Sequence, residues 1–164
     1  MIVADSSGLV ALGSVEVIEP FVTEFDVWTT PETVDSIEAK SARHGPDGEG
    51  ARAALSVTNQ IGVTAPNAEP IVTTRLDRTS GSAVVLARDR DARYHLTDER
   101  RAMHELRQLV PGDVVTPWIA LEALVRTAGL RRQDARFRLD GLLDRARGLE
   151  AAVGNRGHSL IQAE

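Results

Sequence analysis

Short apolar runs alternate along the chain with longer segments whose apolar residues recur at helical spacing. The first run, residues 1–4, is followed by an apolar segment from Leu9 to Leu12. A second run, Phe25 to Thr29, leads into Thr30-Pro31-Glu32, where a proline just inside a helix start and an acid in its first turn are both favourable. Strands that alternate with helices predict an α/β fold of three layers, α/β/α, in which helices cover both faces of a mostly parallel central sheet.

The same pattern gives the expected bounds of the other elements. Helices are expected near residues 31–42 and 51–58, after a Thr79 or Ser80 cap, over 99–109, from Pro117 to Gly129 and over about 132–149. Strands are expected to end at Asp98 and Thr116, and Ser6 or Ser7 is expected to cap the first helix. Residues 43–50 hold three glycines and a proline, which predicts a mobile loop, and residues 61–76 are expected to add one or two short strands.

Length and composition favour one domain. A chain of 164 residues can bury a single core, and we expect this domain to span residues 1–150, followed by a loosely ordered tail over 151–164. The chain has no cysteine, which excludes disulfides, thiolate zinc sites and a cysteine nucleophile. It has no basic lead before an apolar segment and no apolar run long enough to span a membrane, so a cytoplasmic protein without a membrane contact is expected.

The charge of the chain is acidic, with 24 acidic against 19 basic residues and a formal net charge of −5. No global positive field attracts nucleic acid, so any such contact must come from a local patch. Lys40 is the only lysine, and an acid excess with almost no lysine is typical of a salt-adapted or high-GC source. The neighbourhood of Lys40 predicts a solvated helix end.

Candidate chemistry lies where carboxylates follow strands. Asp5 and Asp98 each end an expected strand, and ligands of open α/β sheets bind beyond the carboxyl ends of the strands. Two carboxylates there could share Mg²⁺ or Mn²⁺, ions that serve phosphodiester hydrolysis. Either aspartate could instead be a helix cap, although Ser6 and Ser7 are alternative caps beside Asp5. Glu38, on the helix after the second strand, is the candidate third ligand.

The segment from Ile2 to Leu12 resembles the opening of PIN-domain proteins. Further motifs resemble that family in the right order, over about residues 1–130: Thr30 to Val34, Ser82 to Ala87, Leu96 to Ala102, and Val114 to Thr116 with the helix that follows up to Leu130. The variant most similar is that of small archaeal and bacterial PIN proteins, including VapC-like ribonucleases.

This resemblance implies a Rossmann-like fold and RNA cleavage that depends on Mg²⁺ or Mn²⁺. It carries the family's acidic ligands onto Asp5 and Asp98, and onto Glu38 after a one-residue adjustment from Ile37. Candidate substrate-binding residues are Ser6, Thr116, Arg100 and Arg101. A homodimer through the apolar helix after residue 131 is expected, and a toxin of the VapC kind would have an antitoxin protein as its partner.

One departure from the family keeps a second interpretation open. Related proteins place an acid at the start of the central helix, where this chain has Ser80-Gly81-Ser82, and Asp77 lies upstream at an offset that predicts a different direction. The alternative is a PIN fold with impaired catalysis that acts as a binding or regulatory module. A receiver-like signalling domain is disfavoured because Lys40 is in a helical segment, and the four scattered histidines lack zinc-ligand spacing.

Two further residue classes have alternative explanations. Five arginines flank the Asp98 element: Arg88, Arg90 and Arg93 before it, and Arg100 and Arg101 after it. These arginines could contact a phosphate backbone, or they could form a solvated face paired with acidic residues. Trp28 and Trp118 are expected in the core or an interface, because aromatic platforms for RNA require clustering.

Overall fold

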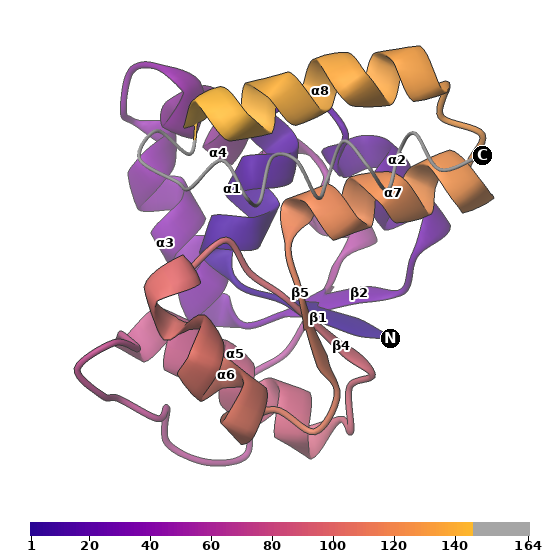
Figure 1. The fold of residues 1–164 in the computed structure, drawn as a ribbon. Coiled ribbons are helices and arrows are strands. Elements are labelled where there is room, and N and C mark those ends of the chain that lie inside the picture. Colours follow the sequence, from indigo (N-terminus) through magenta and orange to yellow (C-terminus); the bar gives the residue numbers. More distant parts are fainter. Residues whose placement is uncertain (146–164) are drawn as a thin grey trace.

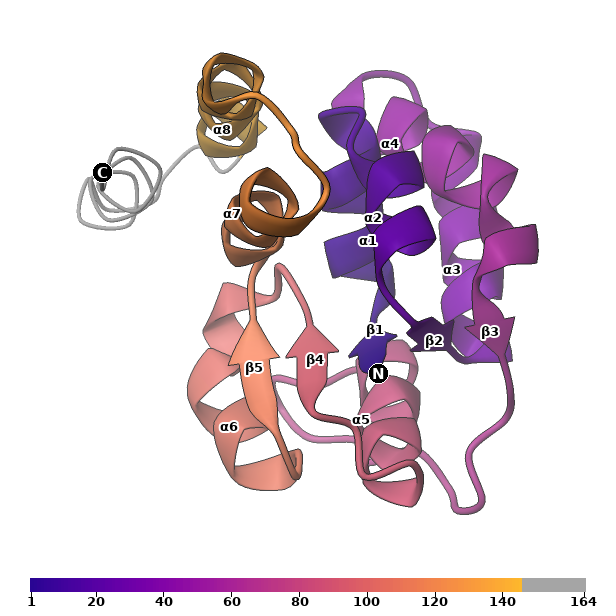
Figure 2. The ribbon, with the colours of Figure 1, turned by 90° about the vertical axis from the view of Figure 1, so that its right-hand side faces the viewer.

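A parallel sheet forms the centre of the molecule, seen here in a computed structural model that describes residues 1–145. Its strands are β1 (Ile2–Ala4), β2 (Val27–Thr29), β3 (Gly62–Val63), β4 (Tyr94–Leu96) and β5 (Asp113–Val115). They lie in the order β3-β2-β1-β4-β5, and each neighbouring pair is parallel (Figure 2). Helices cover both faces, so the predicted three-layer α/β/α class is confirmed (Figure 1).

The two faces of the sheet belong to two hydrophobic cores. On one face Ile2, Ala4 and Leu96 pack under α1 (Ser6–Ser14), α2 (Ile18–Glu24), α4 (Pro46–Ser56), α7 (Pro117–Thr127) and α8 (Arg132–Arg145). On the other face Val3 and Val114 pack under α5 (Arg78–Asp89) and α6 (Met103–Leu109). Successive residues of β1 therefore serve opposite cores, because side chains alternate along a strand.

The strand order reverses between β1 and β4. From β1 the chain builds outward to β2 and β3, and then returns to place β4 on the other side of β1, with β5 beyond it. The pairs Val3–His95 and Ala4–Leu96 set the register of β1 and β4. Ligands of open α/β sheets bind at such a reversal, outside the carboxyl ends of the strands.

Aspartates cap two helices for which serine or threonine caps were predicted. The Asp5 carboxylate accepts a hydrogen bond from the Gly8 N–H, so Asp5 and not Ser6 or Ser7 is the N-cap of α1. Asp77 accepts one from the Ser80 N–H and is the N-cap of α5. Aspartate is as good a cap as serine, so residue type alone did not decide between adjacent candidates.

Residues 43–50 were predicted as a mobile loop, but only residues 43–45 lie outside helices, and residues 46–50 form the start of α4. Pro46 occupies the first turn of α4, where proline is favourable, and Gly48 and Gly50 are buried. A Cβ built on Gly50 would lie 2.3 Å from the Val10 carbonyl oxygen, and one on Gly13 would lie 2.2 Å from the Gly50 carbonyl oxygen. These glycines allow α1 and α4 to pack backbone against backbone, so the composition of the segment reflects close packing.

The remaining elements agree with the sequence pattern apart from two differences. Helix α3 (Pro31–Ser41) lies where it was expected, whereas α2 was not predicted. The expected helix over 99–109 is divided into η2 (Arg100–Ala102) and α6. Residues 61–76 contribute one short strand, β3, which agrees with the expected one or two, and η1 (Thr58–Gln60) precedes it.

The C-terminal predictions are met only as far as the structure extends. Helix α8 begins where it was expected and buries Ala135, Leu139 and Leu142 in the first core. Its expected end at residue 149 and the predicted tail over 151–164 lie outside the described residues. Within residues 1–145, every helix is too short or too polar to cross a lipid bilayer.

Candidate functional site at the carboxyl edge of β1 and β4

Asp5 lies at the carboxyl end of β1 with only 1% of its surface exposed. Its Oδ1 accepts hydrogen bonds from the Ser7 hydroxyl at 2.7 Å and the Gly8 N–H at 2.9 Å, and its Oδ2 accepts one from the Thr97 hydroxyl at 2.6 Å. Thr97 follows β4 directly, so the carboxylate joins the ends of the two adjacent strands. These three bonds fix the orientation of the side chain.

Asp98 is connected to Asp5 through Ser7. The Asp98 N–H donates to the Ser7 hydroxyl oxygen at 2.8 Å, and that same hydroxyl donates to the Asp5 carboxylate. The Asp98 carboxylate lies 3.6 Å from the Arg100 guanidinium Nε. The structure therefore brings the two predicted aspartates to one edge, with Arg100 beside them.

Glu99 belongs to the same acidic group, although the sequence did not single it out. Burial raises the pKa of its carboxyl, and the negative charges of Asp5, Asp77 and Asp98 raise it further, while Arg101 acts in the opposite direction. Asp77 lies close enough for its charge to act on Glu99, while its Oδ1 accepts the Ser80 N–H and caps α5. Carboxylates that follow β1, precede α5 and follow β4 are therefore close enough for their negative charges to act on one another.

Glu38 is not brought to this group. It is exposed on α3, whereas Ser36 and Lys40 of the same helix contact Ser6 beside Asp5. Two residues along a helix correspond to a rotation of about 200°, which directs Glu38 away from that contact. Among residues 1–145, no three Asp, Glu or His side chains are grouped so that they could hold a metal ion together.

Lys40 occupies the site side of α3, which corrects the prediction of a solvated helix end. Its ammonium donates to the Ser6 hydroxyl oxygen at 2.8 Å, and the Ser36 hydroxyl donates to the same oxygen at 3.3 Å. Ser6 itself is buried. The positive charge of Lys40 therefore lies beside Ser6, the residue that follows Asp5.

The position at which the PIN-domain resemblance predicts an acid holds a serine that is bonded to a glutamate. The Ser82 hydroxyl donates to the Glu32 carboxylate at 2.9 Å, linking α5 to the first turn of α3. Burial acts to raise the pKa of Glu32, but hydrogen bonds from its own backbone, Ser82 and Thr30, with the Arg78 charge, hold it below its usual value. Glu32 is thus a negative group next to the central helix.

The arginines around Asp98 divide between the two ends of the sheet. Arg88 donates to the Leu109 carbonyl, Arg90 lies over the Trp28 ring and Arg93 over the Tyr94 ring. These residues precede β4 and lie toward its amino end, away from Asp5. Trp28 is partly buried against the second core, and Trp118 against the first, as predicted.

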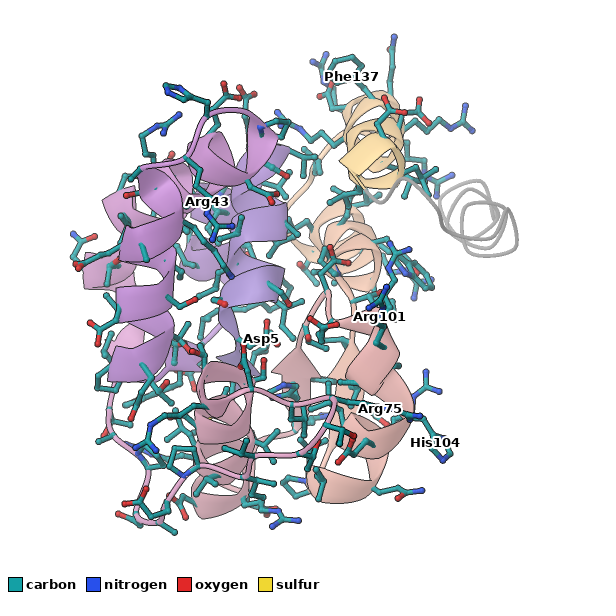
Figure 3. All side chains as sticks on the ribbon, turned by 90° about the vertical axis from the view of Figure 1, so that its left-hand side faces the viewer. Asp5, Arg43, Arg75, Arg101, His104 and Phe137 are labelled. Carbon is teal, nitrogen blue, oxygen red and sulfur yellow. The ribbon has the colours of Figure 1, made fainter. Side chains whose placement is uncertain are left out.

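Exposed arginines do lie around the carboxyl edge. Figure 3 shows Asp5 near the middle of this face, with Arg43 on the α3 side and Arg75 and Arg101 on the other side. Thr116, the remaining predicted binding residue, stands at the N-terminus of α7, and its hydroxyl is buried without a hydrogen-bond partner among the described residues. The acidic centre is thus bordered by separate positive charges.

His95 lies beneath the site in the middle of the sheet. It pairs with Val3 and Val114, is 1% exposed, and neither ring nitrogen has a hydrogen-bond partner within residues 1–145. Burial lowers the pKa of the ring, and the nearby Asp5 charge opposes this effect. A neutral imidazole is therefore enclosed two residues before Thr97.

In our comparisons no family model, curated protein or solved structure matched this chain. The PIN-domain resemblance accordingly stays a prediction from the sequence motifs, while the fold class rests on the strand order and layers.

Residues that sequence reasoning missed contact the site through neighbours distant in the chain. Ser7 was considered only as an alternative cap, yet it and Thr97 hold the Asp5 carboxylate from two strand ends. The spacing of Ser36 and Lys40, four residues apart, was the available signal that both lie on one face of α3. Nothing in the sequence told which partner that face would meet.

Proposed function

We propose that the protein is a ribonuclease of the PIN type, which depends on Mg²⁺ or Mn²⁺ and hydrolyses RNA phosphodiesters at the carboxyl edge of β1 and β4. The observation that carries this proposal is the position of Asp5 and Asp98. They follow the two adjacent strands at the reversal of strand order and are linked through Ser7. The motifs of residues 1–130 that resemble PIN domains supply the substrate class.

The donor set is chemically suited to a hard divalent cation. Magnesium commonly keeps several waters and is held by one or two carboxylates together with a substrate phosphate. Asp5 and Asp98 would hold the ion, which when bound activates water and neutralises charge on the phosphodiester. Ser7 and Thr97 orient the Asp5 carboxylate, and Arg100 is placed to balance charge beside Asp98.

A PIN fold that binds RNA or a protein without efficient catalysis is the second candidate. Two observations favour it: the described residues contain no group of three acidic or histidine ligands, and the Lys40 ammonium lies beside Ser6. Fewer carboxylate ligands lower the affinity for a divalent ion. Both candidates place the interaction at the same edge of the sheet.

Cleavage of RNA distinguishes the two candidates. We expect wild-type protein to cleave a labelled single-stranded RNA with Mn²⁺ and not with EDTA, and Asp5→Asn and Asp98→Asn to lose at least about 100-fold in rate, because each removes a charged ligand. Asparagine keeps an oxygen for the Gly8 N–H, and circular dichroism would verify that both variants fold.

Glu38→Gln is the matched control for the loss of one carboxylate. We expect it to cleave like wild type, because Glu38 faces away from the edge. Equal background cleavage by the wild type and the two aspartate variants would reject the nuclease and favour the binding module.

The proposed protein partners concern a different part of the molecule. Helix α8, after residue 131, leaves Phe137 80% exposed, which supports a protein contact on this helix. A homodimer and an antitoxin partner both remain predictions. Sedimentation of the purified chain would establish whether it self-associates.

A further inference from the structure

A hollow of about 350 Å³ lies between α8 and the turn that follows α1. Among its lining residues are Val15 and Glu16 from that turn, and Phe137, Gly141 and Asp144 from α8. The three α8 residues share one face of the helix, because they are spaced four and three residues apart. We call the hollow bordered by these five residues the α1–α8 groove.

Phe137 gives the groove an exposed aromatic side chain. It is 80% exposed, whereas Leu139 and Leu142 of the same helix are buried in the first core, so Phe137 adds little to the packing of α8. One turn further on, a Cβ built on Gly141 would lie 3.1 Å from the Val15 Cγ1, so the backbone of α8 approaches the end of α1 closely. Aromatic residues of this kind are enriched at the centres of protein interfaces.

The charge at the rim of the groove favours a cation. Glu16 and Asp144 are exposed acids on its two sides. Arg138 also lies at the groove, but it donates to the Val15 carbonyl and lies 3.6 Å from the Glu16 carboxylate, so its charge is directed at its own chain. The Glu16 side chain is still 86% exposed in that ion pair and can be reached by a second cation. Such a rim repels phosphate groups and attracts arginine or lysine.

The end of α1 holds Glu16 in place. The Glu16 N–H donates to the Gly13 carbonyl and the Val17 N–H to the Leu12 carbonyl, which are the two hydrogen bonds of a Schellman motif. The motif requires a left-handed residue, usually glycine, and Glu16 adopts this conformation with a φ of 56°. The carboxylate therefore starts from a backbone position that the helix end determines.

The groove lies at the opposite end of α1 from the carboxylate edge. Asp5 caps the start of α1 and Val15 caps its end. The helix has nine residues, and a rise of 1.5 Å per residue separates its two ends by about 14 Å. Figure 3 likewise shows Phe137 on α8, well apart from Asp5. A segment bound in the groove would leave the edge of β1 and β4 uncovered.

We propose that the α1–α8 groove binds a short segment of a protein partner in which an arginine or lysine lies beside a leucine, isoleucine or phenylalanine. The apolar side chain packs on Phe137 and Val15, and the cationic group meets the Glu16 and Asp144 carboxylates. The volume is near the lower end of the range for ligand pockets, about 300–1,000 Å³, which fits a few side chains of such a segment. The proposal does not depend on RNA cleavage, and it gives the protein contact proposed on α8 a surface and a partner chemistry.

Peptide binding tests the groove directly. Fluorescence anisotropy of a fluorescein-labelled peptide, Gly-Ser-Leu-Arg-Leu-Arg-Leu-Gly-Ser, would be measured with the full chain at 0.15 M salt. We expect saturable binding with a Kd below about 1 mM. Phe137→Ala should weaken it at least about fivefold because the aromatic contact is lost, and Glu16→Gln and Asp144→Asn about 1.5–5-fold each. Peptides with glutamate for arginine, or serine for leucine, should bind at least about tenfold more weakly.

Two variants elsewhere on the surface are matched controls. Glu38→Gln removes an exposed acid from α3 and should leave the Kd unchanged, because a charge outside the groove is screened over a Debye length of about 8 Å. Val72→Ala shortens an apolar side chain that is 62% exposed and should also have no effect. Thermal unfolding would verify that each variant folds, and Phe137→Ala should keep the wild-type Tm, because its side chain lies outside the core.

The outcomes separate the groove from its alternatives. Absence of saturable binding, or equal binding by wild type and Phe137→Ala, would overturn the proposal, and equal weakening by Glu38→Gln and Glu16→Gln would assign the effect to overall charge and overturn it as well. Self-association in sedimentation that Phe137→Ala abolishes and the peptide does not displace would assign the groove to a second copy and overturn the proposed partner. The expected peptide pattern in a chain that does not cleave RNA would support the groove and reject the nuclease.

Discussion

At the scale of single residues, the site depends on side chains with more than one task. Asp5 caps α1 through Gly8 and also connects two strand ends through Ser7 and Thr97. The choice between helix cap and functional carboxylate that the sequence left open is therefore not exclusive. Since α1 begins at this residue, the position of the carboxylate and the start of the helix are determined together.

Replacement of His95 should make the protein more stable and alter its response to pH. Both ring nitrogens are buried without a partner among the described residues, so His95→Leu should raise the free energy of unfolding at pH 7 by about 1 kcal/mol or more. Burial lowers the pKa of the folded ring. Below the unfolded value of about 6.5, only the unfolded chain gains a proton, so wild-type stability falls as the pH decreases.

Urea unfolding of wild type and His95→Leu at pH 7 and pH 5 measures this effect. The wild type should lose more stability between the two pH values than the variant does. His104→Leu is the control, because His104 is exposed on α6 and should change neither quantity appreciably. A variant that loses as much stability as the wild type on acidification would contradict the assignment to His95.

At the scale of elements, contacts between helices decide what local pattern does not. The start of α3 was predictable because Thr30, Pro31 and Glu32 are a cap, a first-turn proline and a first-turn acid, all local signals. Gly48 and Gly50 led to the wrong prediction of a loop. Gly50 is buried against α1 and Gly48 against the Arg43 backbone, and the local composition does not reveal either contact. Capping and first-turn signals can thus be recognised in the sequence, whereas the packing partners of a helix cannot.

The α1–α4 contact should be sensitive to a single methyl group. Gly50→Ala places a Cβ 2.3 Å from the Val10 carbonyl oxygen and must separate the two helices, at a cost of about 2 kcal/mol or more. Gly129→Ala meets nothing within 4 Å and has only a φ of +68° to accommodate, which costs about 1 kcal/mol. Chemical denaturation of both variants compares the two costs, and an equal loss would contradict the close helix packing.

The site itself was only partly predictable for the same reason. The sequence placed Asp5 and Asp98 at strand ends, because a strand that ends in an acid is a local pattern. It favoured Glu38 over its neighbours on α3, since it could not show which face of that helix meets α1. Lys40 was missed because its contact with Ser6 joins residues 34 positions apart.

At the scale of the whole molecule, the reversal of strand order determines where chemistry can be placed. It puts the ends of β1 and β4 side by side and leaves α3 and α5 to supply groups from the flanks. A net charge of −5 is then distributed so that carboxylates gather at the centre of this edge, with arginines around it (Figure 3).

Binding of a divalent ion at this edge should stabilise the whole fold. At a Mn²⁺ concentration 100 times the dissociation constant, linkage adds about 2.7 kcal/mol, which corresponds to a rise in Tm of roughly 5–10 °C for a domain of this size. Differential scanning fluorimetry would record this rise for wild type and Glu38→Gln. Asp5→Asn and Asp98→Asn should show little change with Mn²⁺, and an equal rise in all four proteins would place the ion elsewhere.

The buried glycines of α4 also bear on how the protein can be engineered. Composition marks residues 45–50 as the natural place to insert an affinity tag, a fluorophore loop or a new chain terminus. In the folded protein the end of this segment, at Gly50, is pressed against α1, the helix whose first turn is capped by Asp5. An insertion there would displace the helix that carries the carboxylate, so permuted or tagged versions should be opened at exposed Gly129, where the space around the backbone is open.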